Sequence, residues 1–154
     1  MLKSKITNKI LSAFLFIGVT LTLFTGCTQE PKTPEVAAVD SLFIHLSSDE
    51  PNRARKALGY ALNQRKSGTE VLVWLDDRGV RVADKSINNE FAKVQTIIAD
   101  LATNGVDIIV CPMGMSVYGI NKESLVEGVR MGGSQGKMET KEFLFRPNTK
   151  TLSW

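Results

Sequence analysis

Residues 71–75, VLVWL, form an unbroken apolar run bounded by turn-forming residues. Two other short stretches share this character: LFIHL at 42–46, and VDIIV at 106–110, which only Asp107 interrupts. Nearly continuous apolar runs of this length are typical of strands buried on both faces, as in a parallel sheet. The three stretches therefore predict adjacent central strands.

The two intervening segments have the spacing of amphipathic helices. In 51–66 an apolar residue recurs every three or four positions: Ala54, Ala57, Leu58, Ala61 and Leu62. Ser48 or Asp49 can cap this helix, and Gly68 lies just beyond it. Residues 90–103 repeat the pattern before Asn104-Gly105. The alternation of strands and helices predicts an α/β domain, with right-handed crossovers and helices on the faces of a parallel sheet.

The last third of the chain has weaker patterns. From it we expect short helices at 115–118, 122–127 and 137–145, a glycine-rich loop at 132–136, and a final edge strand at 149–154.

Composition indicates a folded domain without a nucleic-acid surface. The chain has 154 residues, of which 43% are hydrophobic and 23% charged. Three lysines lie in the first nine residues, and the rest of the chain balances 16 basic against 16 acidic residues. Without a cluster of cations we expect no nucleic-acid partner.

The N-terminal residues resemble an export signal. Lys3, Lys5 and Lys9 precede a 15-residue apolar run that ends at Phe24, and 23–27, LFTGC, resembles the lipobox of bacterial lipoproteins. The resemblance implies a signal peptide at 1–26, lipid attachment at Cys27, a tether at 27–39 and a folded domain at 40–154. We therefore expect an exported protein anchored to the cell envelope and facing the periplasm, with Thr28 favouring the outer membrane.

Cys111 is then the remaining thiol, at the end of the third predicted strand. Ligand sites in parallel sheets lie at the carboxyl ends of the strands, where the loops beginning at Ser47, Asp76 and Cys111 would meet. A helix starting after Cys111 would favour the thiolate, which is the nucleophilic form. A buried structural cysteine is the alternative.

Two nearby residues are candidate supporting groups. His45 ends the first strand and could serve as a base or a cation for Cys111, or it could be a hydrogen-bonded rim residue. Arg78 could hold an anionic substrate, or it could be a solvated loop cation. Asp76 and Asp77 are interpreted as turn-forming residues.

Other chemistries have less support. Gly132–Gly136 matches G-x-S-x-G, but a nucleophile elbow needs a later His, and the chain's one His is His45. Gly136-Lys137 lacks the rest of a phosphate loop, and one His with one thiol cannot form a zinc site. Alternating Cys111, Met113 and Met115 could bind Cu(I) if the segment were extended. We otherwise expect neither a metal nor a cofactor.

An ordered set of stretches resembles the DsrE-like family, whose members are small Rossmann-like domains associated with sulfur relay. These stretches are PNRA at 51–54, GTEVLVW at 68–74 with Gly79-Val80 after it, CPM at 111–113 with YGI at 118–120, LVEGV at 125–129 and TLSW at 151–154.

This resemblance implies a three-layer sandwich around about five mostly parallel strands, and self-association into trimers or hexamers. In sulfur-relay members, a cysteine at the position of Cys111 accepts sulfane sulfur as a persulfide from a donor and passes it to an acceptor.

Three functions follow, in order of preference. The first is sulfur transfer or thiol redox chemistry through Cys111. The second is a noncatalytic module that binds a small ligand or a partner, with Cys111 structural. The third is Cu(I) binding by Cys111, Met113 and Met115.

Overall fold

A five-stranded, wholly parallel sheet forms the centre of the domain in a computed structural model, which describes residues 40–133 and 139–154. The strand order is β4-β3-β2-β1-β5. The strands are β1 (Ser41–Leu46), β2 (Glu70–Leu75), β3 (Asp107–Val110), β4 (Val129–Met131) and β5 (Thr149–Ser153). The expected signal peptide at 1–26, the tether at 27–39 with Cys27, and 134–136 of the glycine-rich loop lie outside the described residues.

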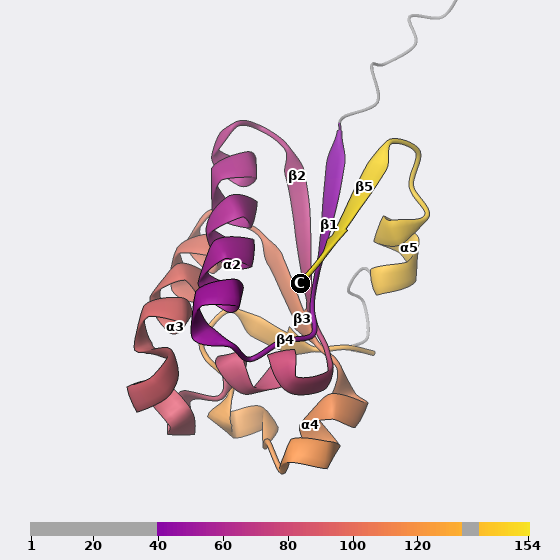
Figure 1. The fold of residues 1–154 in the computed structure, drawn as a ribbon. Coiled ribbons are helices and arrows are strands. Elements are labelled where there is room, and N and C mark those ends of the chain that lie inside the picture. Colours follow the sequence, from indigo (N-terminus) through magenta and orange to yellow (C-terminus); the bar gives the residue numbers. More distant parts are fainter. Residues whose placement is uncertain (1–39, 134–138) are drawn as a thin grey trace, which may run out of the picture. The chain divides into compact units, whose positions relative to one another are not determined.

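Helices cover both faces of the sheet, which gives the expected three layers. Helices α2 (Pro51–Lys66) and α3 (Asn88–Thr103) lie on one face, and α5 (Thr140–Leu144) lies on the other (Figure 1). The chain moves from β1 to β4 in one direction and then returns past β1 to β5. Because right-handed crossovers that run in opposite directions fall on opposite faces, this return places α5 across the sheet from α2 and α3.

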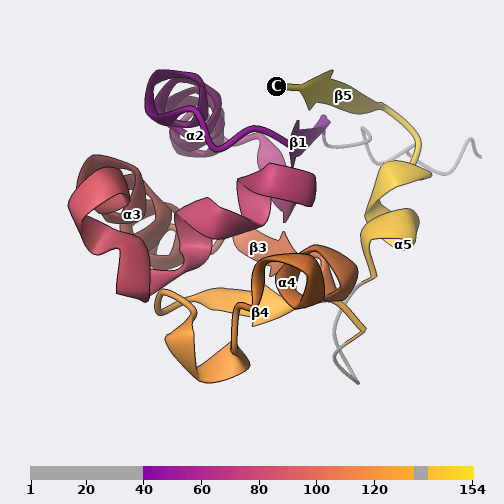
Figure 2. The ribbon, with the colours of Figure 1, turned by 60° about the horizontal axis from the view of Figure 1, so that its bottom comes forward.

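The remaining elements lie at the carboxyl end of the sheet. They are α4 (Pro112–Tyr118) and three 3₁₀ helices, η1 (Asp77–Ala83), η2 (Lys85–Ile87) and η3 (Lys122–Ser124). Figure 2 brings this end of the molecule forward. Within the described ranges, none of the helices combines the length and apolar character needed to cross a bilayer.

Helix α2 has the predicted bounds but a different N-terminal cap. The carboxylate of Glu50 accepts hydrogen bonds from the backbone N–H groups of Asn52 (2.9 Å) and Arg53 (2.7 Å). These bonds satisfy two of the donors that a helix start leaves unpaired, and they lower the pKa of Glu50. The expectation that Ser48 or Asp49 caps α2 is therefore wrong, because Asp49 is buried against arginine side chains instead.

The main core lies between the sheet and helices α2 and α3. Alternate residues of the central strands point into it, together with the predicted stripe of α2, and most of them are fully buried. Burying one such aliphatic side chain contributes about 1.5–3 kcal/mol, so this face supplies most of the stability of the domain.

A smaller cluster covers the opposite face. Phe43, Leu72 and Ile109 are buried there under Phe143 of α5. Helix α5 has five residues, and the ring of Phe143 lies 5.1 Å from the guanidinium carbon of Arg146, which pairs with Glu70 at 2.7 Å. This thin layer depends mainly on one aromatic side chain.

The structure differs from the predictions chiefly after Cys111. Of the helix expected at 137–145, residues 137 and 138 lie outside the described residues, and within 139–145 α5 covers 140–144; 122–127 contains a single 3₁₀ turn. Strand β4 was not predicted, because three half-buried residues are too few to show strand periodicity. The final strand lies at the edge of the sheet as expected.

Candidate functional site

The ends of three adjacent strands bring their side chains to one face of the sheet. His45 of β1 is paired in register with Trp74 of β2, and Trp74 with Ile109 of β3. Paired residues of a parallel sheet point to the same side, and so do residues two positions further along an extended chain. Asp76 and Cys111, two residues beyond Trp74 and Ile109, therefore reach the same place.

Asp76 is the centre of this group. Its carboxylate accepts a hydrogen bond from the backbone N–H of Asp77 (2.8 Å) and lies near enough to the thiol of Cys111 and the side chain of Trp74 for both to influence its pKa. Nε2 of His45 lies 3.7 Å from Asp76 Oδ2. Partial burial acts to raise the pKa of Asp76, but the backbone N–H of Asp77, the Cys111 thiol, His45 and Trp74 together outweigh it, and the pKa is lowered. Asp76 thus places an ionised carboxylate beside the thiol.

Cys111 occupies the N-cap position of α4. Its N–H donates to Leu75 O at 2.9 Å and its carbonyl accepts from Met115 N at 3.0 Å, so its backbone is fixed to both β2 and α4. The thiol makes no capping hydrogen bond with α4, all of which is described. The sulfur therefore does not bond to the N–H groups of the helix, and the nearby group that interacts with it electrostatically is the Asp76 carboxylate.

The half-buried sulfur side chain opens onto a pocket of about 210 Å³. Asp76 and Asp77 line it together with α4 residues that include Met113, Val117 and Tyr118. The Tyr118 hydroxyl donates to Asp77 Oδ1 at 3.2 Å, and partial desolvation and this bond raise the pKa of Tyr118. Cys111 is consequently neither exposed on a flat surface nor sealed in the core.

Two glycines allow the segments that form this pocket to pack closely against their neighbours. A Cβ on Gly79 would overlap the carbonyl oxygen of Leu46 at the end of β1. A Cβ on Gly114 would lie 2.8 Å from Val80 Cγ1, where α4 meets η1. These close approaches fix the distance between the Asp76-Asp77 turn and α4.

Arg78 does not line the pocket. Its Nε lies 3.0 Å from Asp49 Oδ1, and Arg81 binds the other oxygen of the same buried carboxylate. A buried carboxylate strongly favours pairing with cations. Asp49 therefore pairs with Arg78, whose side chain is 61% exposed, so the structure favours the loop cation over the anion-binding group among the two roles considered for it.

The expectation of a Cu(I) site at Cys111, Met113 and Met115 is wrong. The segment is helical rather than extended, so residues two apart point in nearly opposite directions. Met113 is 76% exposed, whereas Met115 is 4% exposed and belongs to the core. Within 40–133 and 139–154, no group of three or more His, Cys, Asp or Glu side chains is arranged to hold a metal ion.

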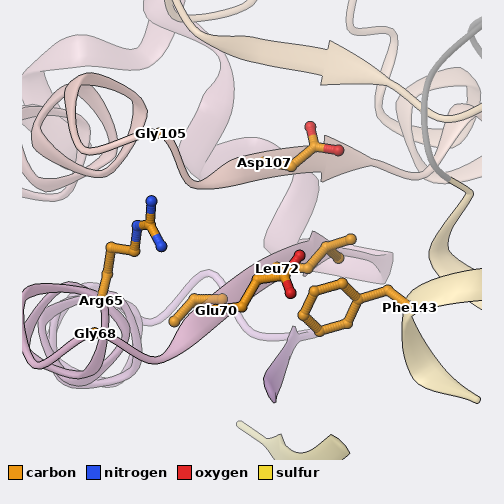
Figure 3. A pocket seen from close by; sticks show the side chains of 8 residues that line it. Arg65, Gly68, Glu70, Leu72, Gly105, Asp107 and Phe143 are labelled. Atoms are coloured by element: carbon orange, nitrogen blue, oxygen red, sulfur yellow. The ribbon is translucent and has the colours of Figure 1, made fainter. Parts of the chain in front are cut away.

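A second pocket, of about 390 Å³, lies at the opposite end of the sheet (Figure 3). Its charged side chains already have partners: Arg65 Nε donates to Asn104 O (2.8 Å), Glu70 pairs with Arg146, and Asp107 accepts two bonds from Arg130 (2.6 and 2.7 Å). The ring of Phe143 forms part of its wall. It is larger than the Cys111 pocket but contains no nucleophile among its lining residues.

Fold and site together define a parallel α/β domain that carries one thiol at the carboxyl edge of its sheet. The model of the DsrE/DsrF-like family matches residues 40–138. The chain belongs to this family, which is generally associated with sulfur relay. No curated protein matches the chain.

Solved structures share this fold. A protein of unknown function, MTH1491 from Methanobacterium thermoautotrophicum, matches with a TM-score of 0.59 and 16% identity over 74% of this chain and 98% of its own. The ychN protein from E. coli matches with a TM-score of 0.59 and 14% identity, over 75% of this chain and 99% of its own. BT1422 from Bacteroides thetaiotaomicron, a conserved protein of unknown function, matches with a TM-score of 0.56 and 21% identity, over 75% of this chain and 95% of its own. At these identities the likeness is one of fold.

Proposed function

We propose that the chain carries sulfane sulfur as a persulfide on Cys111. The observation that supports this most is the position of the thiol: half-buried, beside an ionised carboxylate, and open to a pocket at the carboxyl ends of parallel strands. Membership of a family associated with sulfur relay supports the same chemistry. The noncatalytic binding module remains the competing hypothesis, and it makes the opposite prediction for the sulfur.

The transfer is an exchange without net oxidation. The Cys111 thiolate attacks the outer sulfur of a donor R–S–SH, and its electron pair forms the new S–S bond. The donor's S–S bond breaks, the pair leaves on R–S⁻, and the proton given up by the thiol ends on that leaving group. The products are Cys111–S–SH and R–SH, and an acceptor thiolate unloads the sulfur by the same step in reverse.

The surroundings of Cys111 suit a carrier rather than a dithiol oxidoreductase. Cys27 is the other cysteine in the chain, and Cys111 is free in the described structure. Gly114, one helical turn into α4, is packed against Val80. A loaded persulfide therefore has no neighbouring thiol in α4 to displace its sulfur, and the sulfur stays until an external acceptor arrives.

Mass spectrometry of the full-length chain tests this proposal. A Cys27→Ser variant leaves Cys111 as the one thiol, and exposure to an organic persulfide should add about 32 Da to the peptide that contains Cys111. A second thiol should remove the added mass and appear as a persulfide itself. The matched control, Cys27→Ser with Cys111→Ser, should gain nothing.

The competing module predicts another result. If Cys111 gains no sulfur in the folded chain although it does so after unfolding, the carrier proposal is wrong. The domain would then be a binding module in which Cys111 has a structural role.

We also propose that Cys27 is lipid-modified after export and that the mature chain self-associates, as the two resemblances imply. Cells fed labelled palmitate should incorporate the label into the native chain and not into Cys27→Ala. Sedimentation of the purified chain should give a trimer or a hexamer. An unlabelled native chain, or a monomer at all concentrations, would contradict the respective proposal.

A further inference from the structure

The pocket beside Cys111 combines negative charge with an apolar wall. Asp76 and Asp77 line the pocket together with Cys111, and the other lining residues come from α4. On α4, Met113 and Val117 are 76% and 72% exposed, so their side chains face solvent at the mouth. Of the described residues that line the pocket, none is a cation.

The nearest cations do not cancel this charge. Arg78 follows Asp77 in sequence, but its guanidinium is bound to Asp49; Arg81 also pairs with Asp49 and lies 3.8 Å from Glu90, so these two cations are matched by two other carboxylates. His45 faces Asp76 at 3.7 Å, and a protonated imidazole there would offset one of the two carboxylates. Asp77 keeps its own charge, since its partner at 3.2 Å is the neutral Tyr118 hydroxyl.

The size of the pocket limits what can enter. Its volume of about 210 Å³ is below the roughly 300–1,000 Å³ of sites for drug-sized ligands. A small organic chain fits, with its apolar part against Met113 and Val117 and its sulfur toward Cys111. Any charge on such a chain comes close to Asp76 and Asp77.

We infer that this pocket selects sulfur donors by charge, accepting small organic persulfides that carry an ammonium group and rejecting anionic donors such as thiosulfate. The inference rests on the proposed function, because it names the substrate class of that same thiol. Its physical basis is Coulombic: like charges placed near each other at a partly desolvated site slow the approach, and opposite charges assist it.

Thiosulfonates of matched size test the charge selection without any sulfane transfer. The Cys111 thiolate attacks their sulfenyl sulfur, a mixed disulfide forms, and methanesulfinate leaves with the electron pair. One reagent carries a trimethylammonium group and the other a sulfonate. Rates on the full-length Cys27→Ser chain are divided by the rates of the same reagents with a small neutral thiol. They are measured at pH 8, where imidazoles are ordinarily neutral.

We expect the normalised rate of the cationic reagent to exceed that of the anionic one by about tenfold at low salt. The ratio should shrink as salt is added, because screening acts over about 10 Å at 0.1 M ionic strength. Equal normalised rates, or a faster anionic reagent, would overturn the inference.

Asp77→Asn is the decisive variant. Asp77 has a φ of +46°, a conformation that Asn adopts readily, and the amide oxygen can still accept from Tyr118. The substitution therefore removes charge while keeping shape, and the ratio should fall to about threefold, since one of two charges is lost. Asp100→Asn, an exposed site on α3 away from the pocket, should leave the ratio unchanged. An unaltered ratio in Asp77→Asn would count against charge selection.

Sulfane donors separate this inference from the proposed function. Cysteamine persulfide should load Cys111 faster than the persulfide of 3-mercaptopropionate, and faster than thiosulfate. If all three load equally, sulfur carriage stands and charge selection fails. If no donor loads the thiol while the thiosulfonate ratio is as expected, the carrier proposal fails and the pocket's preference for cations stands.

Discussion

The two ends of the sheet use charged side chains in opposite ways. At the amino end, Glu70 and Asp107 are each bound to an arginine, and the larger pocket has Phe143 in its wall. At the carboxyl end, Arg78 and Arg81 both pair with Asp49, and Asp76 lies beside the Cys111 thiol. Both ends thus hold carboxylates, but among the described residues only the carboxyl end places one beside a cysteine. The larger of the two pockets lies at the amino end, away from Cys111.

The clearest test of this contrast is a destabilising substitution at the amino end of the sheet. Phe143→Ala removes the buried ring that covers Phe43 and Leu72, and it should lower the free energy of unfolding by about 3–4 kcal/mol. Urea denaturation measures the loss. Without urea, the folded Phe143→Ala variant should react with thiosulfonates at Cys111 as fast as the parent chain. A loss below about 1 kcal/mol, or a changed thiol rate, would show that the two ends are not independent.

A smaller effect is expected from a backbone change at the carboxyl end. In Gly79→Ala the new methyl group meets the carbonyl of Leu46, so the Asp76-Asp77 turn must shift. We expect the free energy of unfolding, measured by urea denaturation, to fall by about 2–3 kcal/mol, and the rate at which Cys111 reacts with thiosulfonates to change.

Gly59→Ala is the matched control for Gly79→Ala. Gly59 lies within α2, and nothing is within 4 Å of its would-be Cβ. Alanine favours a helix more than glycine does, so this variant should gain about 0.5–1 kcal/mol. If both variants changed stability in the same direction, the close approach at Gly79 would not be the cause.

The smallest effect concerns pH. The lowered pKa of Asp76 means that the unfolded chain holds the proton more tightly. Its contribution to stability is therefore present above the ordinary value of 3.8 and is lost as pH falls through the lower folded pKa. Asp76→Asn should cost at most about 0.5 kcal/mol at pH 7, because the side chain is 38% exposed and screened. The difference between variant and parent should vanish in acid. A difference that grew below pH 3.8 would contradict the sign.

Strong periodicity made most of the fold predictable. The stripe of α2 and the three apolar runs fixed the helices and central strands to within two residues. Patterns failed where elements were too short to repeat, as in β4 and α5. The cap at Glu50 was missed because Asp49, the better capping type, is buried by two arginines that come from a distant segment.

The site was only partly predictable, for a similar reason. Cys111 and His45 follow from the rule that loops at the carboxyl ends converge. The part played by Asp76 depends on register: it lies two residues beyond Trp74, which is paired with both His45 and Ile109. The sequence alone does not show which residues of neighbouring strands are paired. The copper hypothesis likewise depended on an extended segment at 111–115, whereas the helix already begins at Pro112.

The position of Trp74 gives the domain an optical reporter next to Cys111. The indole lies near the Asp76 carboxylate, as the Cys111 thiol does, and it packs where a Cβ on Gly132 would come within 3.2 Å of the ring. Trp154 is the other tryptophan in the chain, so Trp154→Phe would leave a single emitter beside the sulfur. The proposed loading and unloading of Cys111 could then be tested by fluorescence in real time, without any attached dye.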